Sequence, residues 1–166
     1  MRLYEKIKLF LNNHSAPYFE IHHEPATTSE DSARARGESM RIGAKALLVK
    51  ARVQSQEKFV LAVLPADRKL DLQKLGELLG GRISFASPDE LQSVTGCTKG
   101  AVPPFGELIG IKMIVDSALF DNEDIAFNAA SLTNSIKMKS ADYRRIVMPR
   151  EGEFTINQFH FPPFKP

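Results

Sequence analysis

The pattern of apolar and polar positions divides the chain into interleaved helices and strands. Leu3, Ile7, Phe10 and Leu11 recur at helical spacing, so residues 3–13 are predicted to form an amphipathic helix. The continuous apolar run at residues 59–64 is typical of a strand that is buried on both faces. Similar patterns predict strands at 18–23, 44–53, 82–86, 111–115, 125–128 and 135–138, and helices at 29–37, 70–79, 88–94 and 140–147.

Capping and turn residues support these boundaries. Thr28 precedes acidic residues at 30 and 31, and Ser87 precedes Pro88, so both open helices in a favourable way. The polar residues 54–58 are predicted to close a hairpin between two strands. Because several strands are joined by short links, we expect an α/β fold of the α+β type, with a mixed, partly barrel-like sheet and flanking helices.

Composition limits the class of protein. The chain has 166 residues, enough for one domain, and a net charge of only +2, so any nucleic-acid contact must come from a local patch. Cys97 is the single cysteine, which excludes an internal disulfide and fits a cytoplasmic location. No apolar run is long enough to span a bilayer. Residues 151–166 are assigned to a tail, whose Phe- and Pro-rich end at 158–166 is expected to pack on the body or on a second subunit.

The segment at residues 96–106 is the strongest candidate for a functional loop. It contains three glycines and the pair Pro103-Pro104, between a predicted helix and a predicted strand. Glycine permits close backbone approach and proline fixes the chain, so a ligand could lie against the main chain of this loop. The same residues also suit an ordinary surface connection.

Other candidate groups each have two interpretations. Lys45 lies among apolar neighbours, so its amine is either held at the lip of a pocket or exposed at a strand edge. Asp116 is either the N-cap of a short helix or a side chain that points into the site. Cys97 lacks a sequence-level base and is expected to be structural. Adjacent His22 and His23 point to opposite faces of a strand, so no metal site is predicted.

Two further sets are less specific. Residues 128–135 are small and polar, which suits either close ligand approach or a turn. Positive clusters could contact phosphate if they flank one cleft, although solvated faces are the default. The clusters are Arg34, Arg36 and Arg41, and Lys137, Lys139, Arg144, Arg145 and Arg150.

In order along the chain, several segments resemble the YbaK/prolyl-tRNA-editing (INS-like) family of aminoacyl-tRNA deacylases. They are residues 28–33, 43–47 with Lys45, 63–71, 95–106 with Gly-x-x-x-Pro on Gly100 and Pro104, 115–116 and 127–129. The resemblance runs from about residue 17 to 149. It implies hydrolysis of the ester between a small, mischarged amino acid and the terminal adenosine of a non-cognate tRNA, such as tRNA-Pro.

The resemblance also implies roles for individual residues. Lys45 would bind the terminal nucleotide or the carbonyl oxygen, Gly100 and Ala101 would donate backbone N–H groups to the oxyanion, Pro104 would stiffen the loop, and Asp116 would orient substrate or lysine. Contacts to substrate are expected from Thr28, Val102, Phe105, Gly106, Asn128 and Ser131. In the family, water is activated largely by the ribose hydroxyl of the tRNA, so no metal or cofactor is expected.

The expected partner is the acceptor end of an aminoacyl-tRNA, with a synthetase as a further candidate, no membrane, and a monomer or homodimer. Three positions depart from the family pattern: Ala130 and Leu132 replace glycine and histidine, and Glu107 stands where some members have histidine. These changes motivate an alternative, a module that binds a tRNA end, a nucleotide or a synthetase without turnover. A generic ester hydrolase would be a third class, but the chain has no Gly-x-Ser-x-Gly segment.

Overall fold

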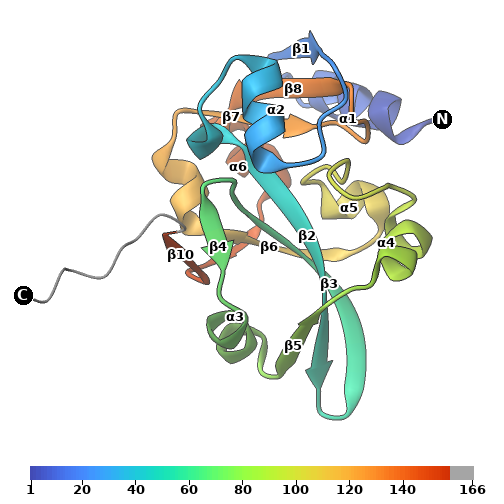
Figure 1. Ribbon diagram of the computed structural model, residues 1–166, viewed down its shortest axis with the longest axis vertical. Helices are drawn as coiled ribbons and strands as arrows, with labels where there is room; N and C mark the ends of the chain where they lie inside the picture. Colours follow the sequence, from blue (N-terminus) through green and yellow to red (C-terminus); the bar gives the residue numbers. More distant parts are fainter. Residues whose placement is uncertain (158–166) are drawn as a thin grey trace, which may run out of the picture.

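The computed structural model describes residues 1–157, and its largest sheet is mixed, as predicted (Figure 1). Its strand order is β5 (Arg82–Phe85), β2 (Ala44–Val53), β3 (Gln56–Pro65), β6 (Lys112–Asp116) and β9 (Arg150–Gly152). The pairs β3–β6 and β6–β9 are parallel, whereas β2 is antiparallel to both of its neighbours. This arrangement follows from the order of elements along the chain: β2 and β3 form a hairpin, while β6 is reached only after three intervening helices.

Two smaller sheets complete the β structure of the described residues. One is antiparallel, with the order β1 (Tyr18–His22), β8 (Asn134–Lys139) and β7 (Asp124–Asn128). The other pairs β10 (Thr155–Asn157) with β4 (Arg68–Leu70). An isolated bridge between Gly43 and Ala126 joins the start of β2 to β7, so the larger two sheets meet at that point.

The helices of the described residues are α1 (Leu3–Asn13), α2 (Ser29–Arg36), α3 (Leu72–Leu79), α4 (Pro88–Thr95), α5 (Gly106–Ile109) and α6 (Ser140–Val147), with short 3-10 turns at Met40–Ile42 and Ser117–Asp121. Capping residues mark the N-terminal ends of α2, α3 and α4. The Thr28 hydroxyl accepts from the Asp31 N–H at the start of α2. Ser87 and Glu90 form a capping box at α4. Both predicted N-caps are confirmed.

Several boundaries differ from the prediction. Gln54 and Ser55 have φ of 51° and 64° and form a two-residue turn, so β3 begins three residues earlier than its apolar run. The short elements β4 and α5 were not predicted. Residues 151–157, which sequence reasoning assigned to a tail, contribute to β9 and β10, and Phe154 between them is fully buried. The expectation for residues 158–166 lies outside the described residues.

Two apolar cores lie on the large sheet. The larger one packs α1, α6 and the residues around α5 against the sheets, with Tyr143, Phe105 and Phe127 among its largest buried side chains. The smaller one lies under α3 and includes Leu75 and Phe154. Within the described part of the chain, no helix combines the length and apolar character needed to cross a membrane.

Candidate active site

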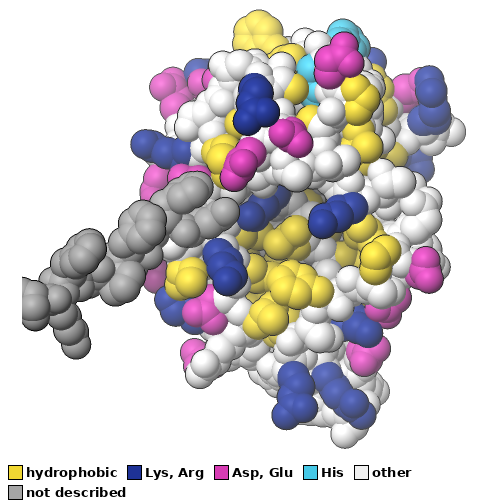
Figure 2. Space-filling view, viewed as in Figure 1, with side chains coloured by type: hydrophobic (Ala, Val, Ile, Leu, Met, Phe, Trp, Pro, Cys, Tyr) yellow, Lys and Arg dark blue, Asp and Glu magenta, His cyan; other side chains and the backbone are white. Residues whose placement is uncertain are grey.

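A cavity of about 370 Å³ opens beside the N-terminal end of β2. Its walls come from α2, from residues 43–47, from the loop at 96–106 and from the end of β7. Figure 2 shows this hollow on one face of the molecule, with hydrophobic side chains on its floor and Lys and Arg at its border. The elements that form it are far apart in the sequence, so the fold creates the site.

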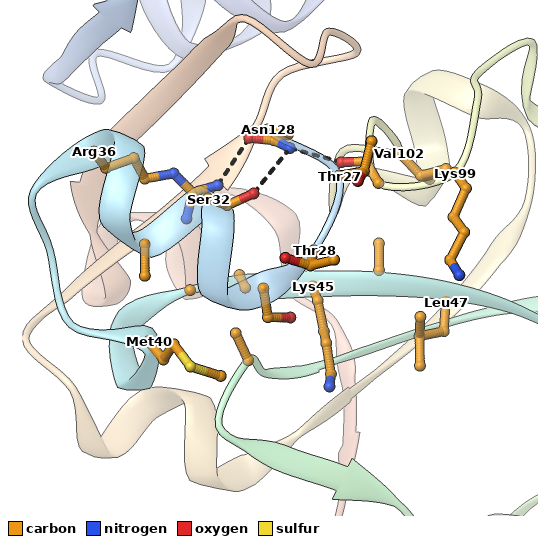
Figure 3. Close-up of a pocket in the computed structure, with 17 residues that line it drawn as sticks. Thr27, Thr28, Ser32, Arg36, Met40, Lys45, Leu47, Lys99, Val102 and Asn128 are labelled. Atoms are coloured by element: carbon orange, nitrogen blue, oxygen red, sulfur yellow. Dashed lines mark hydrogen bonds between the residues drawn. The ribbon is translucent and has the colours of Figure 1, made fainter. Parts of the chain in front are cut away.

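The charged side chains that line the cavity are all positive. Arg36, Lys45 and Lys99 line it, and none of the described lining residues is acidic. Burial lowers the pKa of the Lys45 amine, and the negative charge of Asp67 opposes this effect only in part. Figure 3 shows the side chains of Lys45 and Lys99 extending in the same direction. A cavity with this charge suits an anionic ligand such as a phosphate group.

The loop at residues 96–106 is anchored in the core at its C-terminal end. The buried Tyr143 hydroxyl donates to the Pro104 carbonyl oxygen at 2.6 Å. The neighbouring Phe105 ring packs edge-on against the rings of Phe10, Phe127 and Tyr143, with centroid distances of 5.9, 5.3 and 5.5 Å. Pro104 and Phe105 therefore hold the loop in place from behind, whereas Gly100 and Val102 face the cavity.

Gly100 occupies a position that other residues would not tolerate. Its φ is 86°, and a Cβ atom placed there would lie 2.6 Å from the Thr27 carbonyl oxygen. Its backbone therefore lies directly against the segment that leads into α2. The N–H of the next residue, Ala101, donates to the Thr98 carbonyl at 3.0 Å and is thereby committed to the turn.

Asn128 connects the two sides of the cavity. Its Nδ2 donates to the Gly100 carbonyl at 2.7 Å and to the Ala26 carbonyl at 3.3 Å. Its Oδ1 accepts from Arg36 Nη2 and from Ser135 Oγ, each at 3.0 Å. Figure 3 shows Asn128 between Arg36 and the loop that carries Val102. The side chain thus tethers the loop to β7.

The structure brings together some of the residues expected at the site. Thr28, Lys45, Gly100, Val102 and Asn128 all line the cavity. The others do not line it: Ala101, Pro104, Phe105, Gly106, Asp116 and Ser131.

The residues outside the cavity have structural contacts. Asp116 is 2% exposed, and its carboxylate accepts from the backbone N–H groups of Ala118 and Phe154 at 2.9 Å each. The N-cap interpretation of Asp116 is therefore confirmed, and its carboxylate is occupied away from the cavity. Ser131 Oγ accepts from the backbone N–H of Thr133 within the β7–β8 turn.

Sequence reasoning missed several lining residues. Arg36 and Lys99 were placed only within a charge cluster and a loop, and Thr27, Ser32 and Met40 were not singled out. The i, i+4 spacing of Ser32 and Arg36 does place them on one face of α2, which is a signal that could have found them.

Cys97, His22 and His23 do not form a separate reactive centre. Cys97 is buried, and burial raises the pKa of its thiol, which disfavours a reactive thiolate. His22 contacts Asn134, whereas His23 contacts Ser135, so the two rings have different partners. Among residues 1–157, no group of three or more His, Cys, Asp or Glu side chains is placed to hold a metal ion.

Comparison with known proteins identifies the family. Residues 23–146 match the aminoacyl-tRNA editing domain. The chain belongs to this family. It is 38% identical over 153 residues to the multifunctional Ser/Thr-tRNA deacylase ProXp-y of Escherichia coli K12, covering 91% of this chain and 92% of that one. As a member of the editing family, it is a trans-editing aminoacyl-tRNA deacylase.

One further relative and one solved structure are also similar to this chain. The prolyl-tRNA editing protein ProX of Acetoanaerobium sticklandii is 29% identical over 142 residues, covering 82% of this chain and 85% of that protein. The crystal structure of hypothetical protein APE2540 has a TM-score of 0.81 at 18% identity and covers 91% of this chain and 99% of that chain. The structural match supports the editing-domain fold.

Proposed function

We propose that the cavity beside β2 is the deacylation site, and that it removes serine or threonine from tRNAs that should carry another amino acid. The observation that carries this proposal is the meeting of Lys45, Gly100 and Asn128 around one cavity without a lining acid. The Escherichia coli relative is a Ser/Thr-tRNA deacylase, which supports the choice of amino acid.

The two lysines suit the nucleotide end of the substrate. In this arrangement Lys45 and Lys99 bind the phosphate of the terminal adenosine, or Lys45 binds the carbonyl oxygen of the ester. Small side chains at Ala44, Ala46 and Ala66 leave room for an amino acid of limited size. The hydroxyl group of Ser32, at the same cavity, can exchange hydrogen bonds with a hydroxyl-bearing amino acid.

The reaction is a hydrolysis that needs positioning more than a strong protein base. The oxygen of water bonds to the ester carbonyl carbon, the bond from that carbon to the ribose oxygen breaks, and the ribose oxygen takes a proton. None of the described lining residues is Asp, Glu or His. We therefore propose that a hydroxyl group of the substrate ribose assists the water, while the backbone N–H of Gly100 donates to the carbonyl oxygen of the ester.

The alternative of a non-catalytic binding module rests on Glu107, Ala130 and Leu132. None of these three residues lines the cavity. The changes therefore leave the residues that face the substrate intact, which favours turnover over binding alone. A cytoplasmic location, where charged tRNA is used, accords with this function, and a synthetase is a further candidate partner.

The test is a panel of mischarged tRNAs incubated with the purified protein in the presence of a metal chelator. We expect release of serine or threonine from at least one non-cognate tRNA, and no release from a correctly charged tRNA of the same sequence. Binding of these tRNAs without release of any amino acid would support the binding module and contradict the proposal.

A further inference from the structure

Arg36 lies in the wall of the cavity, and its guanidinium group donates hydrogen bonds to neighbouring side chains of the wall. It is the last residue of α2, and its Nε donates to Ser135 Oγ at 2.8 Å while its Nη2 donates to Asn128 Oδ1 at 3.0 Å. Burial lowers its pKa to about 10, so the guanidinium group is charged at neutral pH. Arg34, two residues earlier, is 79% exposed and pairs with Asp31 at 3.5 Å. The two arginines of one helix therefore have different environments.

Arg36 and Ser135 on one side of Asn128, and two backbone carbonyl groups on the other, fix which way its amide faces. An amide oxygen only accepts hydrogen bonds and an amide NH₂ only donates them. Because both Arg36 and Ser135 donate, Oδ1 must face them, and Nδ2 is left to face the carbonyl groups of Gly100 and Ala26. A flipped amide would place its NH₂ group against the guanidinium, where it could not form a hydrogen bond.

The orientation of Asn128 in turn places the corner of the catalytic loop. Its Nδ2 donates to Gly100 O at 2.7 Å, which fixes the peptide group between Gly100 and Ala101. On the other side, Gly100 lies against Thr27, with no room for a Cβ atom. Gly100 is therefore held between the backbone of Thr27 and the side chain of Asn128. Only the Asn128 contact is linked to a charged group, the guanidinium of Arg36.

We infer that Arg36 is a positioning residue for deacylation: it orients Asn128 so that the Gly100 corner is preformed before the substrate arrives. This inference rests on the proposed role of the loop in holding the ester carbonyl. Two of the three guanidinium nitrogens are committed to Ser135 and Asn128. This distinguishes Arg36 from Lys45 and Lys99, which also line the cavity and whose side chains extend together in one direction (Figure 3).

The first test separates positioning from direct substrate binding. We expect Arg36→Ala to lower kcat by about 10- to 100-fold while KM changes by less than threefold. Arg36→Lys should keep part of the rate, because an ammonium group can replace one donor but does not reproduce the fixed fork. Arg34→Ala is the matched control on the same helix and should keep the full rate. A large rise in KM with unchanged kcat in Arg36→Ala would overturn the inference.

A double-mutant cycle tests the path through Asn128. If Arg36 acts through Asn128, Arg36→Ala and Asn128→Ala combined should be no slower than the slower single variant. Rate losses that multiply would show independent action and would contradict the inference. Guanidinium ion at millimolar concentration should partly restore kcat to Arg36→Ala and leave Asn128→Ala unchanged.

Asn128→Asp keeps the test decisive if Arg36→Ala does not fold. An aspartate still accepts from Arg36 and Ser135, but it turns an oxygen toward the Gly100 carbonyl. We expect a folded protein with a kcat reduced as in Asn128→Ala. If the wild-type protein deacylates tRNA and the Asn128→Asp and Arg36→Lys variants are both fully active, the inference fails but the proposed function stands. If the wild-type protein deacylates no tRNA, the proposed function itself fails.

Discussion

Replacement of Lys45 by methionine should reduce deacylation without weakening the fold. Lys45 lies on β2 at the cavity, and burial lowers the pKa of its amine. A cation in such a place costs folding free energy, because desolvation disfavours the charged form. Methionine keeps an unbranched stem and removes the charge, so the substitution affects the binding of an anionic group far more than the packing of the strand.

The expected size of the effect follows from the proposed contact. A hydrogen bond to a charged group contributes about 1.5–3 kcal/mol. Since each 1.36 kcal/mol is a tenfold change in rate, loss of the Lys45 contact should lower kcat/KM by about 10- to 150-fold. The free energy of unfolding, measured in urea at neutral pH, should stay the same or rise.

The pH dependence of stability provides a second readout for Lys45. Its folded-state pKa lies below the ordinary value of 10.5, so the unfolded chain binds more protons than the native protein between those two values. The free energy of unfolding therefore gains an increment as the pH rises through this window. Lys45→Met should lack that increment, which urea titrations at several alkaline pH values can measure.

Lys50 provides the control for the Lys45 variant. It lies on the same strand, outside the cavity, and pairs with Glu90 at 3.3 Å. Lys50→Met should keep kcat/KM within about twofold, since surface ion pairs are worth about 0–1 kcal/mol and this one is remote from the substrate. A Lys45→Met variant with the full rate, or one that loses several kcal/mol of stability, would refute the reasoning.

Three further predictions concern the walls and supports of the cavity. Tyr143→Phe removes the donor to the buried Pro104 carbonyl; the free energy of unfolding in urea should fall by about 1–3 kcal/mol, and an unchanged value would contradict this contact. Ala130 has a φ of 61°, a left-handed conformation that costs a non-glycine residue about 1–2 kcal/mol. Ala130→Gly removes this backbone strain, which exceeds the entropy cost of glycine of about 0.5–1 kcal/mol, so the thermal unfolding midpoint should rise. A lower midpoint would count against this account. Gly100→Ala places a Cβ atom 2.6 Å from the Thr27 carbonyl oxygen, so it should lower kcat by more than about tenfold (about 1.4 kcal/mol), and full activity would show that the loop can shift.

Local signals predicted most of the fold. The helix α1 and the strand β2 were predicted with their observed boundaries, because helical periodicity and an apolar-rich segment are local patterns. The short elements were missed because they are stabilised by distant partners. For example, β4 pairs with β10, and residues 68–70 and 155–157 contain no pattern that reveals this pairing.

The site was only partly predictable for the same reason. Lys45 was found because a lysine among apolar residues is unusual within its own segment. The spacing of Ser32 and Arg36 indicates a shared face of α2, but it does not reveal the partner of Arg36, because Asn128 is 92 residues away. Phe105 was expected to contact substrate, yet it is 2% exposed in the core, since a loop residue can serve either surface and the local sequence does not decide which.

The contacts around Ala130 and Leu132 show how these two departures from the family pattern relate to the cavity. Leu132 and Ala130 lie in the turn after β7, and the Leu132 carbonyl accepts from the Ala26 N–H at 3.0 Å. The Ala26 carbonyl accepts in turn from Asn128, so this turn reaches the cavity only through the framework that supports it. Substitutions in this turn therefore alter the stability of the cavity wall. The side chains that face the cavity should determine which amino acid is removed, and Ser32 and Met40 are the first that should be substituted to test this.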